Sequence, residues 1–264
     1  MTNLAGTPYA LSQGVGGVPF ASILALGPQL AVSLNEPGSL FQERSDAAST
    51  PSAVGDRVGT VKNWGVLGLN LIAPTDSARP FLRATANGKR YLEGDGVDDA
   101  LTRALSALRG VSGWTIVLGI RFPAVTSLPF FVSGSGNASA RATFVTGATG
   151  IQLGGRRENA DSFATTAFGG TAGADVVLVG TGDYTNTRAA LYINRSLIAQ
   201  NTSWLTAGVT PNDGGGVALF SNASGTASWM AGRIFSSLLY PTVLSPAGIA
   251  LAETWTAEQI GISI

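Results

Sequence analysis

The sequence contains no cysteine and no histidine. Without cysteine the chain forms no disulfide and offers no thiolate nucleophile. Without histidine it lacks the most common general base, the Ser-His-Asp triad and most kinds of zinc site. These two absences exclude several of the usual chemistries of hydrolytic enzymes.

Charge is scarce as well. Asp, Glu, Lys and Arg make up 12% of the 264 residues, and 16 positive charges balance 16 negative ones. An ordinary globular protein has about 25% charged residues. A net charge of zero gives no electrostatic reason to bind nucleic acid or an anionic membrane. The low charge allows two explanations: other subunits cover part of the surface, or Ser, Thr, Asn and Gly build it.

Long hydrophobic runs are also missing. No apolar stretch reaches the roughly 18 residues that span a bilayer. The start of the chain, Met1–Leu4, has no basic segment before an apolar one, as a signal peptide would have. The sequence therefore predicts synthesis in a cytoplasm, with neither membrane insertion nor secretion by a leader.

Short apolar runs between frequent Gly and Pro residues predict an all-β fold. The best strand runs from Trp114 to Phe122, with Trp114, Ile116 and Leu118 on one face. Val117 lies on the other face and makes that face partly apolar. Further strands are expected at 128–133, 141–146, 150–154, 175–180, 188–193, 197–200, 216–221 and 229–239. Their spacing predicts a two-sheet antiparallel jelly-roll sandwich.

The two ends of the chain differ from this pattern. Ser245 followed by Pro246 is a typical helix start, and it predicts one short C-terminal helix. Residues 1–28 carry no charge, since the first charged side chain is Glu36, and they predict an N-terminal extended arm before a jelly-roll domain at 29–264. Such an arm is either a disordered tail or a segment that orders against a neighbouring subunit. A tail is usually more polar, which favours assembly. The assembly residues would be Val18, Phe20, Ile23, Leu24 and Leu26.

Two stretches resemble a known family. The first runs from Ser39 through Val54–Gly59 and Tyr91–Glu93 to Gly94–Asp99, and the second is 188–255, with Leu191–Arg195 and Gly232–Tyr240. Together they resemble the concanavalin A-like/LamG jelly-roll proteins of tailed bacteriophages. The resemblance implies a virion structural protein on capsid or tail, assembled in the host cytoplasm, whose partners are other virion proteins and copies of itself. The alternative is a carbohydrate-binding module that recognises host surface glycans.

A sugar site is expected near Trp204. This residue lies in the polar segment Asn201–Trp204, where an exposed indole would stack on a sugar ring, and Asn212 and Asp213 on the next glycine-rich loop would orient a hydroxyl. The alternative is that Trp204 belongs to the core, as large aromatic residues more often do.

Three acids, Asp95, Asp98 and Asp99, are candidate calcium ligands, because hard carboxylate oxygens on a turn suit that ion. The alternative is that they cap the turn by accepting backbone hydrogen bonds. No other cofactor is indicated.

Catalysis is not expected. A retaining glycosidase needs two carboxylates about 5–5.5 Å apart. The six glutamates do not form a pair two or four residues apart on any expected strand. The sequence therefore predicts a protein that is not an enzyme.

Overall fold

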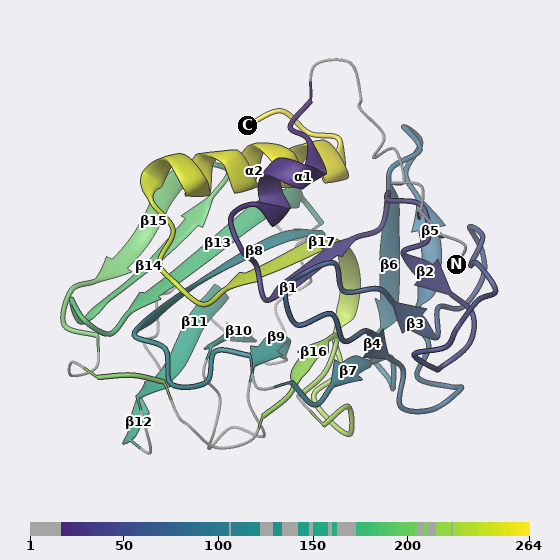
Figure 1. The fold of residues 1–264 in the computed structure, drawn as a ribbon, viewed down its shortest axis with the longest axis horizontal. Coiled ribbons are helices and arrows are strands. Elements are labelled where there is room, and N and C mark those ends of the chain that lie inside the picture. The colour runs from purple at the N-terminus through teal and green to yellow at the C-terminus, as the bar shows by residue number, and fades with distance from the viewer. Residues whose placement is uncertain are drawn as a thin grey trace, which may run out of the picture.

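The computed structural model describes residues 17–105, 107–121, 129–133, 142–147, 150–157, 160–162, 173–204, 208–210, 215–222 and 224–264. Over these residues the chain forms three layers, with two helices on one sheet and a second sheet beneath it (Figure 1). All the strand pairings are antiparallel. The predicted two-sheet antiparallel sandwich is confirmed.

The first sheet lies directly under the helices. Its strands, in spatial order, are β15 (Ser196–Asn201), β14 (Arg188–Ile193), β13 (Asp175–Asp183), β8 (Gly113–Arg121), β17 (Ala231–Tyr240), β6 (Arg90–Asp95) and β5 (Phe81–Ala84), and β1 (Leu30–Ser33) also pairs with β17. Helix α2 (Pro246–Ile260) lies on three adjacent strands of this sheet, β13, β8 and β17.

The second sheet contains several very short strands. Its order is β12 (Ala160–Ser162), β11 (Gly150–Arg157), β10 (Ala142–Gly147), β9 (Pro129–Ser133), β16 (Val217–Leu219), β7 (Leu101–Arg103), β4 (Leu71–Ile72), β3 (Thr60–Val61) and β2 (Leu40–Phe41). Strands β2, β3 and β4 have two residues each.

Strand β8 shows why the chain has two hydrophobic cores. Its alternate residues Trp114, Ile116 and Leu118 enter the core between the sheets. Val117, on the opposite face, enters a second core between the first sheet and the helices. Because both faces are covered, all of β8 except Arg121 is buried. The two-sided character predicted for this strand is confirmed.

Helix α2 (Pro246–Ile260) covers the first sheet and begins as predicted. The Oγ atom of Ser245 accepts a hydrogen bond from the N–H of Gly248, and Pro246 occupies the first turn. Gly261 ends the helix with φ of 86°, the left-handed conformation that glycine adopts most easily. Over the described part of the chain, no helix combines the length and hydrophobicity needed to cross a membrane.

The expected extended arm is wrong for the residues that the structure describes. Helix α1 (Phe20–Leu24) packs beside α2, and the ring of Phe20 stacks on Trp255 with centroids 5.1 Å apart. Phe20 and Ile23 are buried, and Val18, Leu24 and Leu26 pack against the same core. The physical reason is that the apolar outer face of the first sheet needs a cover, and this segment supplies part of it. Residues 1–16 lie outside the described residues.

Strand β15 forms one edge of the first sheet. It contains no charged residue and no proline. The side chains of Leu197 and Ile198 on this strand are 47% and 39% exposed.

Candidate functional site

The exposed position expected for Trp204 is wrong. Trp204 is only 1% exposed and belongs to the core between the sheets. Its ring meets Trp114 edge-on at 6.1 Å and Tyr184 at 5.1 Å between centroids. The polar neighbours Asn201 and Ser203 bond locally, with Asn201 Oδ1 accepting the N–H of Ser203, so the turn stays at the surface while the indole points inward. Trp204 is therefore no platform for a sugar.

Asn212 and Asp213, the other two residues of the expected sugar site, lie outside the described residues. Their role in binding stays a prediction. The buried position of Trp204 removes the aromatic partner that the prediction gave them.

The three candidate calcium ligands do come together. One carboxylate oxygen from each of Asp95, Asp98 and Asp99 lies within 4.8 Å of the others. The Oδ2 atom of Asp99 accepts the N–H of Asp95, and Oδ1 of Asp95 accepts the N–H of Val97. These bonds match the turn-capping alternative, and calcium binding stays a prediction.

Asp99 is the buried member of the three. Its side chain is 2% exposed, and its Oδ1 atom lies 3.8 Å from Nη1 of Arg57. No hydrogen bond reaches that oxygen. Burial raises the pKa of Asp99 to about 6, because the charged form loses its hydration. The hydrogen bond from Asp95 and the Arg57 guanidinium oppose this shift in the pKa only in part.

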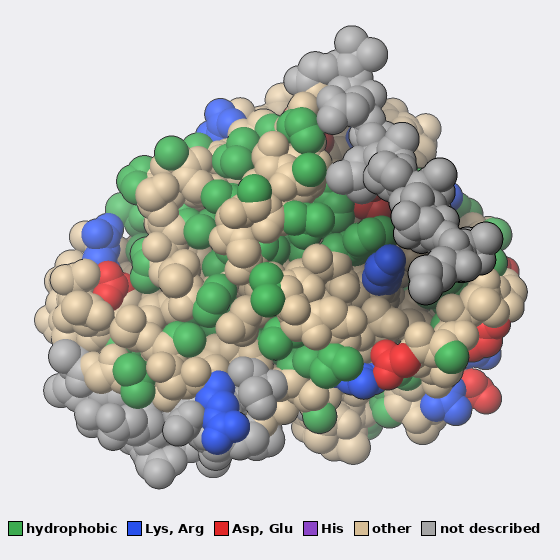
Figure 2. Space-filling view, in the orientation of Figure 1, with side chains coloured by type: hydrophobic (Ala, Val, Ile, Leu, Met, Phe, Trp, Pro, Cys, Tyr) green, Lys and Arg blue, Asp and Glu red, His purple; other side chains and the backbone are tan. Residues whose placement is uncertain are grey.

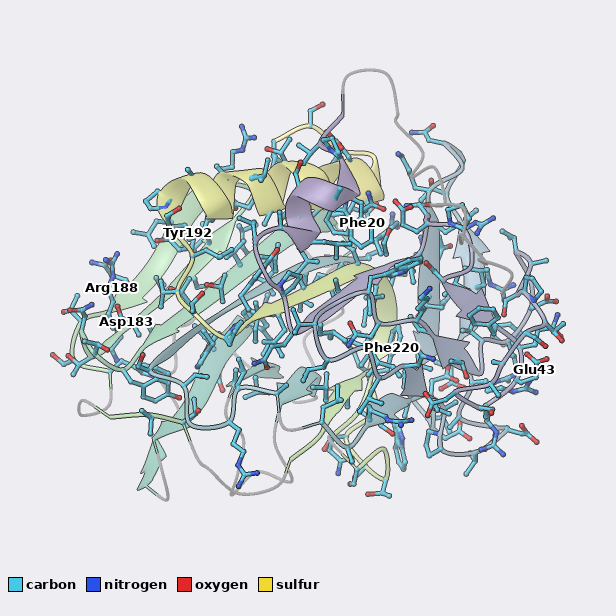
Figure 3. All side chains as sticks on the ribbon, viewed as in Figure 1. Phe20, Glu43, Asp183, Arg188, Tyr192 and Phe220 are labelled. Carbon is cyan, nitrogen blue, oxygen red and sulfur yellow. The ribbon has the colours of Figure 1, made fainter. Side chains whose placement is uncertain are left out.

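A pocket that the sequence did not indicate lies beside the C-terminal end of α2. Its volume is about 160 Å³. The walls come from the entry to α1, the residues after β1, the turn between β5 and β6, and the last two turns of α2. The polar and aromatic side chains that line it are Asn35, Glu36, Lys89, Trp255, Glu258 and Gln259. Figure 3 shows Phe20, another lining residue, below the right-hand end of α2.

Glu36 is the notable residue of this pocket. It is 6% exposed, and its Oε2 atom is buried without a hydrogen-bond partner. Loss of hydration on burial raises the pKa of this carboxyl. A buried acceptor that lacks a partner costs free energy, on the order of 1–3 kcal/mol and more when it is charged. A ligand that brings a donor to this oxygen would recover that cost.

Glu258 holds the N-terminal segment across the pocket. Both carboxylate oxygens accept the N–H of Val18, at 3.1 and 3.0 Å. The neighbouring Gly17 lies close to this carboxylate: a Cβ there would be 2.9 Å from Oε2 of Glu258, and the Glu258 side chain would have to move. A carboxylate from α2 thus fixes the backbone that forms one wall.

The amide side chains of the pocket are fixed in place. Oε1 of Gln259 accepts hydrogen bonds from Oγ of Ser33 and from Nδ2 of Asn35, at 3.2 and 3.0 Å. Oδ1 of Asn35 accepts the N–H of Arg90 at 3.2 Å. These bonds join α2 to β1 and β6, so this side of the pocket is pre-organised for binding.

Lys89 carries the one ammonium group among the residues that line the pocket. Its stem lies against the end of α2, where its Cγ is 3.1 Å from the position of a Cβ on Gly261. The last turn of α2 contains no basic residue. Lys89 therefore supplies the positive charge that a helix C-terminus favours.

A second hollow, of about 240 Å³, lies between β14 and the first half of α2. Tyr192, Ile249 and Ala250 make it mostly apolar. Its buried acid, Glu253, accepts the N–H of Arg195 at 3.0 Å. Because that carboxylate already has a partner, this hollow offers a ligand fewer polar groups than the pocket of Glu36.

The visible face above α1 and α2 carries many hydrophobic side chains and few charged ones (Figure 2). Charged groups inside the Glu36 pocket are thus set in a surface that is otherwise poor in charge. One feature of the sequence marks the pocket: Glu36 is the first charged residue after a long uncharged segment. Its neighbour Glu258 lies near the other end of the chain, so local spacing does not reveal the pair.

No family model matches the chain, and no curated protein is similar to it. Solved structures are similar in fold at low sequence identity. The binding domain of Paraclostridial Mosquitocidal Protein 1 has a TM-score of 0.54 and 10% identity, over 75% of this chain and 49% of that one. The binding domain of botulinum neurotoxin serotype D has a TM-score of 0.52 and 11% identity, over 88% and 52%.

A sialidase of Trypanosoma rangeli, solved with sialic acid, has a TM-score of 0.52 and 11% identity, over 93% of this chain and 38% of that one. The chain thus spans about half or less of the length of these three proteins. These likenesses agree with the layers described above: the chain is an antiparallel β-sandwich of the jelly-roll type, closed by one C-terminal helix.

Proposed function

We propose that this protein is a carbohydrate-binding module and that the pocket of Glu36 receives a sugar ring. The observation that carries the proposal is Glu36, a residue that lines the pocket and whose buried Oε2 atom has no hydrogen-bond partner. Jelly-roll neighbours described as binding domains, and one solved with sialic acid, support a binding role.

Sugar hydroxyls suit the groups that the pocket presents. A hydroxyl donates one hydrogen bond and accepts others, so neighbouring hydroxyls can meet both a carboxylate and an ammonium group. Glu36 needs a donor, and Lys89 needs an acceptor. A volume of about 160 Å³ corresponds to about five water molecules. That space is suited to one ring rather than to an oligosaccharide.

Binding is a better reading than hydrolysis. Glu36 and Glu258 share the pocket, but the carboxylate of Glu258 is tied to the fold, because it accepts the N–H of Val18 on both oxygens. Histidine is the most common general acid and base, and the chain contains none.

The virion role now rests on the family resemblance, the scarcity of charge and the absence of recognisable catalytic groups. Its main structural motive was an apolar arm that docks on another subunit, whereas the described part of that arm packs on its own chain. Glycan binding has a pocket to support it, and we therefore place it first.

Glycan-array screening followed by calorimetry tests the proposal. We expect Glu36→Ala and Lys89→Ala each to weaken binding by about tenfold or more, since hydrogen bonds to charged groups contribute about 1.5–3 kcal/mol. Glu43→Ala is the matched control, because Glu43 does not line the pocket and lies at the right-hand edge of Figure 3, away from the pocket residue Phe20. Unchanged affinity in both pocket variants, with their thermal stability retained, would show that the glycan binds elsewhere.

A further inference from the structure

We infer that the sugar bound in this pocket carries a free ammonium group, as an amino sugar without an N-acetyl group does. This inference rests on the proposed function and names the ligand class of the same site. The charged side chains that line the pocket carry two carboxylates and one ammonium group.

None of these three groups is neutralised by a neighbour. Over the described residues, no salt bridge of 4.0 Å or less involves Glu36, Glu258 or Lys89. The pocket therefore presents a net negative charge to a ligand. A ligand with a carboxylate would be repelled by it, and a ligand with a positive charge would be attracted.

Lys89 and Glu258 already have roles in the fold. The Lys89 stem packs at the end of α2, which has no basic residue of its own. Glu258 receives the N–H of Val18 on both oxygens. Of these three residues, Glu36 is the one with a buried side-chain oxygen that has no hydrogen-bond partner.

An ammonium group on the ligand is a better hydrogen-bond donor to the carboxylate of Glu36 than a hydroxyl is. A charge-assisted hydrogen bond between N–H and carboxylate is roughly twice as strong as a neutral one. The ammonium also supplies the opposite charge that a buried carboxylate requires. An N-acetyl group would remove that charge and add bulk in a pocket of about 160 Å³.

Calorimetry with matched methyl glycosides tests the inference on the full chain. The ligands are the amino, hydroxyl, N-acetylamino and uronic acid forms, in both gluco and galacto series, together with n-butylamine as an ammonium without a ring. We expect one amino sugar to bind at least tenfold more tightly than its hydroxyl counterpart, and the N-acetyl, uronate and butylamine ligands to bind more weakly than it.

The variant Glu36→Gln keeps the shape of the side chain and removes its charge. We expect it to abolish the preference for the amino sugar, while the control Glu43→Gln keeps that preference. A preference that survives in Glu36→Gln would overturn the inference, and so would equal binding of butylamine. Binding of neutral sugars without any preference would refute the inference and leave the proposed function standing, whereas a lack of binding by every sugar would refute both.

Discussion

At the scale of single residues, the buried carboxylates set the behaviour of the protein with pH. Burial raises the pKa of Glu36, Asp99 and Glu253 above their ordinary values. An acid with a raised pKa holds its proton more tightly in the folded state than in the unfolded chain. The free energy of unfolding therefore falls as the pH rises through the interval between the two pKa values.

For Asp99 this interval runs from the ordinary aspartate pKa of 3.8 to about 6. We expect stability to decrease across it by about 3 kcal/mol from this residue alone, at about 1.4 kcal/mol per pKa unit. The variant Asp99→Asn removes the ionisation and should flatten the curve between about pH 4 and 6. Urea denaturation at several pH values measures the difference. Curves of equal slope for the two proteins would show that Asp99 is not the group responsible.

The environments of single side chains were predicted poorly from the sequence, and the reason is the same for Trp204 and Glu36. Trp204 has polar neighbours in the chain, but its burial depends on Trp114 and Tyr184, which are distant in sequence. Glu36 shares its pocket with Lys89 and with Glu258 of α2, which are distant in sequence. The environment of a side chain is set by long-range contacts, which one local stretch does not contain.

At the scale of elements, strong local signals gave correct predictions. Ser245 and Pro246 fixed the start of α2, and the alternation in 114–122 identified β8 and its two faces. The short strands β2, β3 and β4 have two residues each. A strand of that length carries no periodicity, so it exists only through its pairing partners. Helix α1, with five residues, is too short to form without the surface beneath it.

Phe20 tests how α1 is held. We expect Phe20→Ala to lower the free energy of unfolding by about 3–5 kcal/mol, because a buried ring that stacks on Trp255 is lost. The molecular mass by light scattering should not change, since these contacts lie within one chain. Val66→Ala, at a side chain that is 76% exposed, is the control and should change stability little. Dissociation of an oligomer by Phe20→Ala would restore the hypothesis of an assembly arm.

At the scale of the whole molecule, the spacing between the layers depends on glycine. A Cβ on Gly180 would lie 2.5 Å from Cζ of Phe144, so only glycine lets β13 approach the second sheet at that point. The composition indicated a sandwich rich in turns, but it did not show that some glycines serve packing. The stacking of the two sheets and the presence of α2 were predictable. The contribution of α1 to the third layer was not.

Two glycine substitutions should act in opposite directions. We expect Gly180→Ala to destabilise the fold by about 1–3 kcal/mol through overpacking. Gly248→Ala should stabilise it by about 0.5–1 kcal/mol, because Gly248 lies within α2 and a Cβ there would meet nothing closer than 3.5 Å. Thermal unfolding of both variants measures the contrast. A stable Gly180→Ala variant would mean that the layers separate more easily than this packing implies.

The edge strand β15 has a consequence for handling the protein. Among the described residues no strand pairs with its outer edge, and its six residues carry no charge and include the exposed Leu197 and Ile198. Natural proteins usually protect such an edge with lysine, proline or a covering loop. In concentrated solution this strand is where aggregation would begin, and a single lysine there would act as a gatekeeper without touching either core.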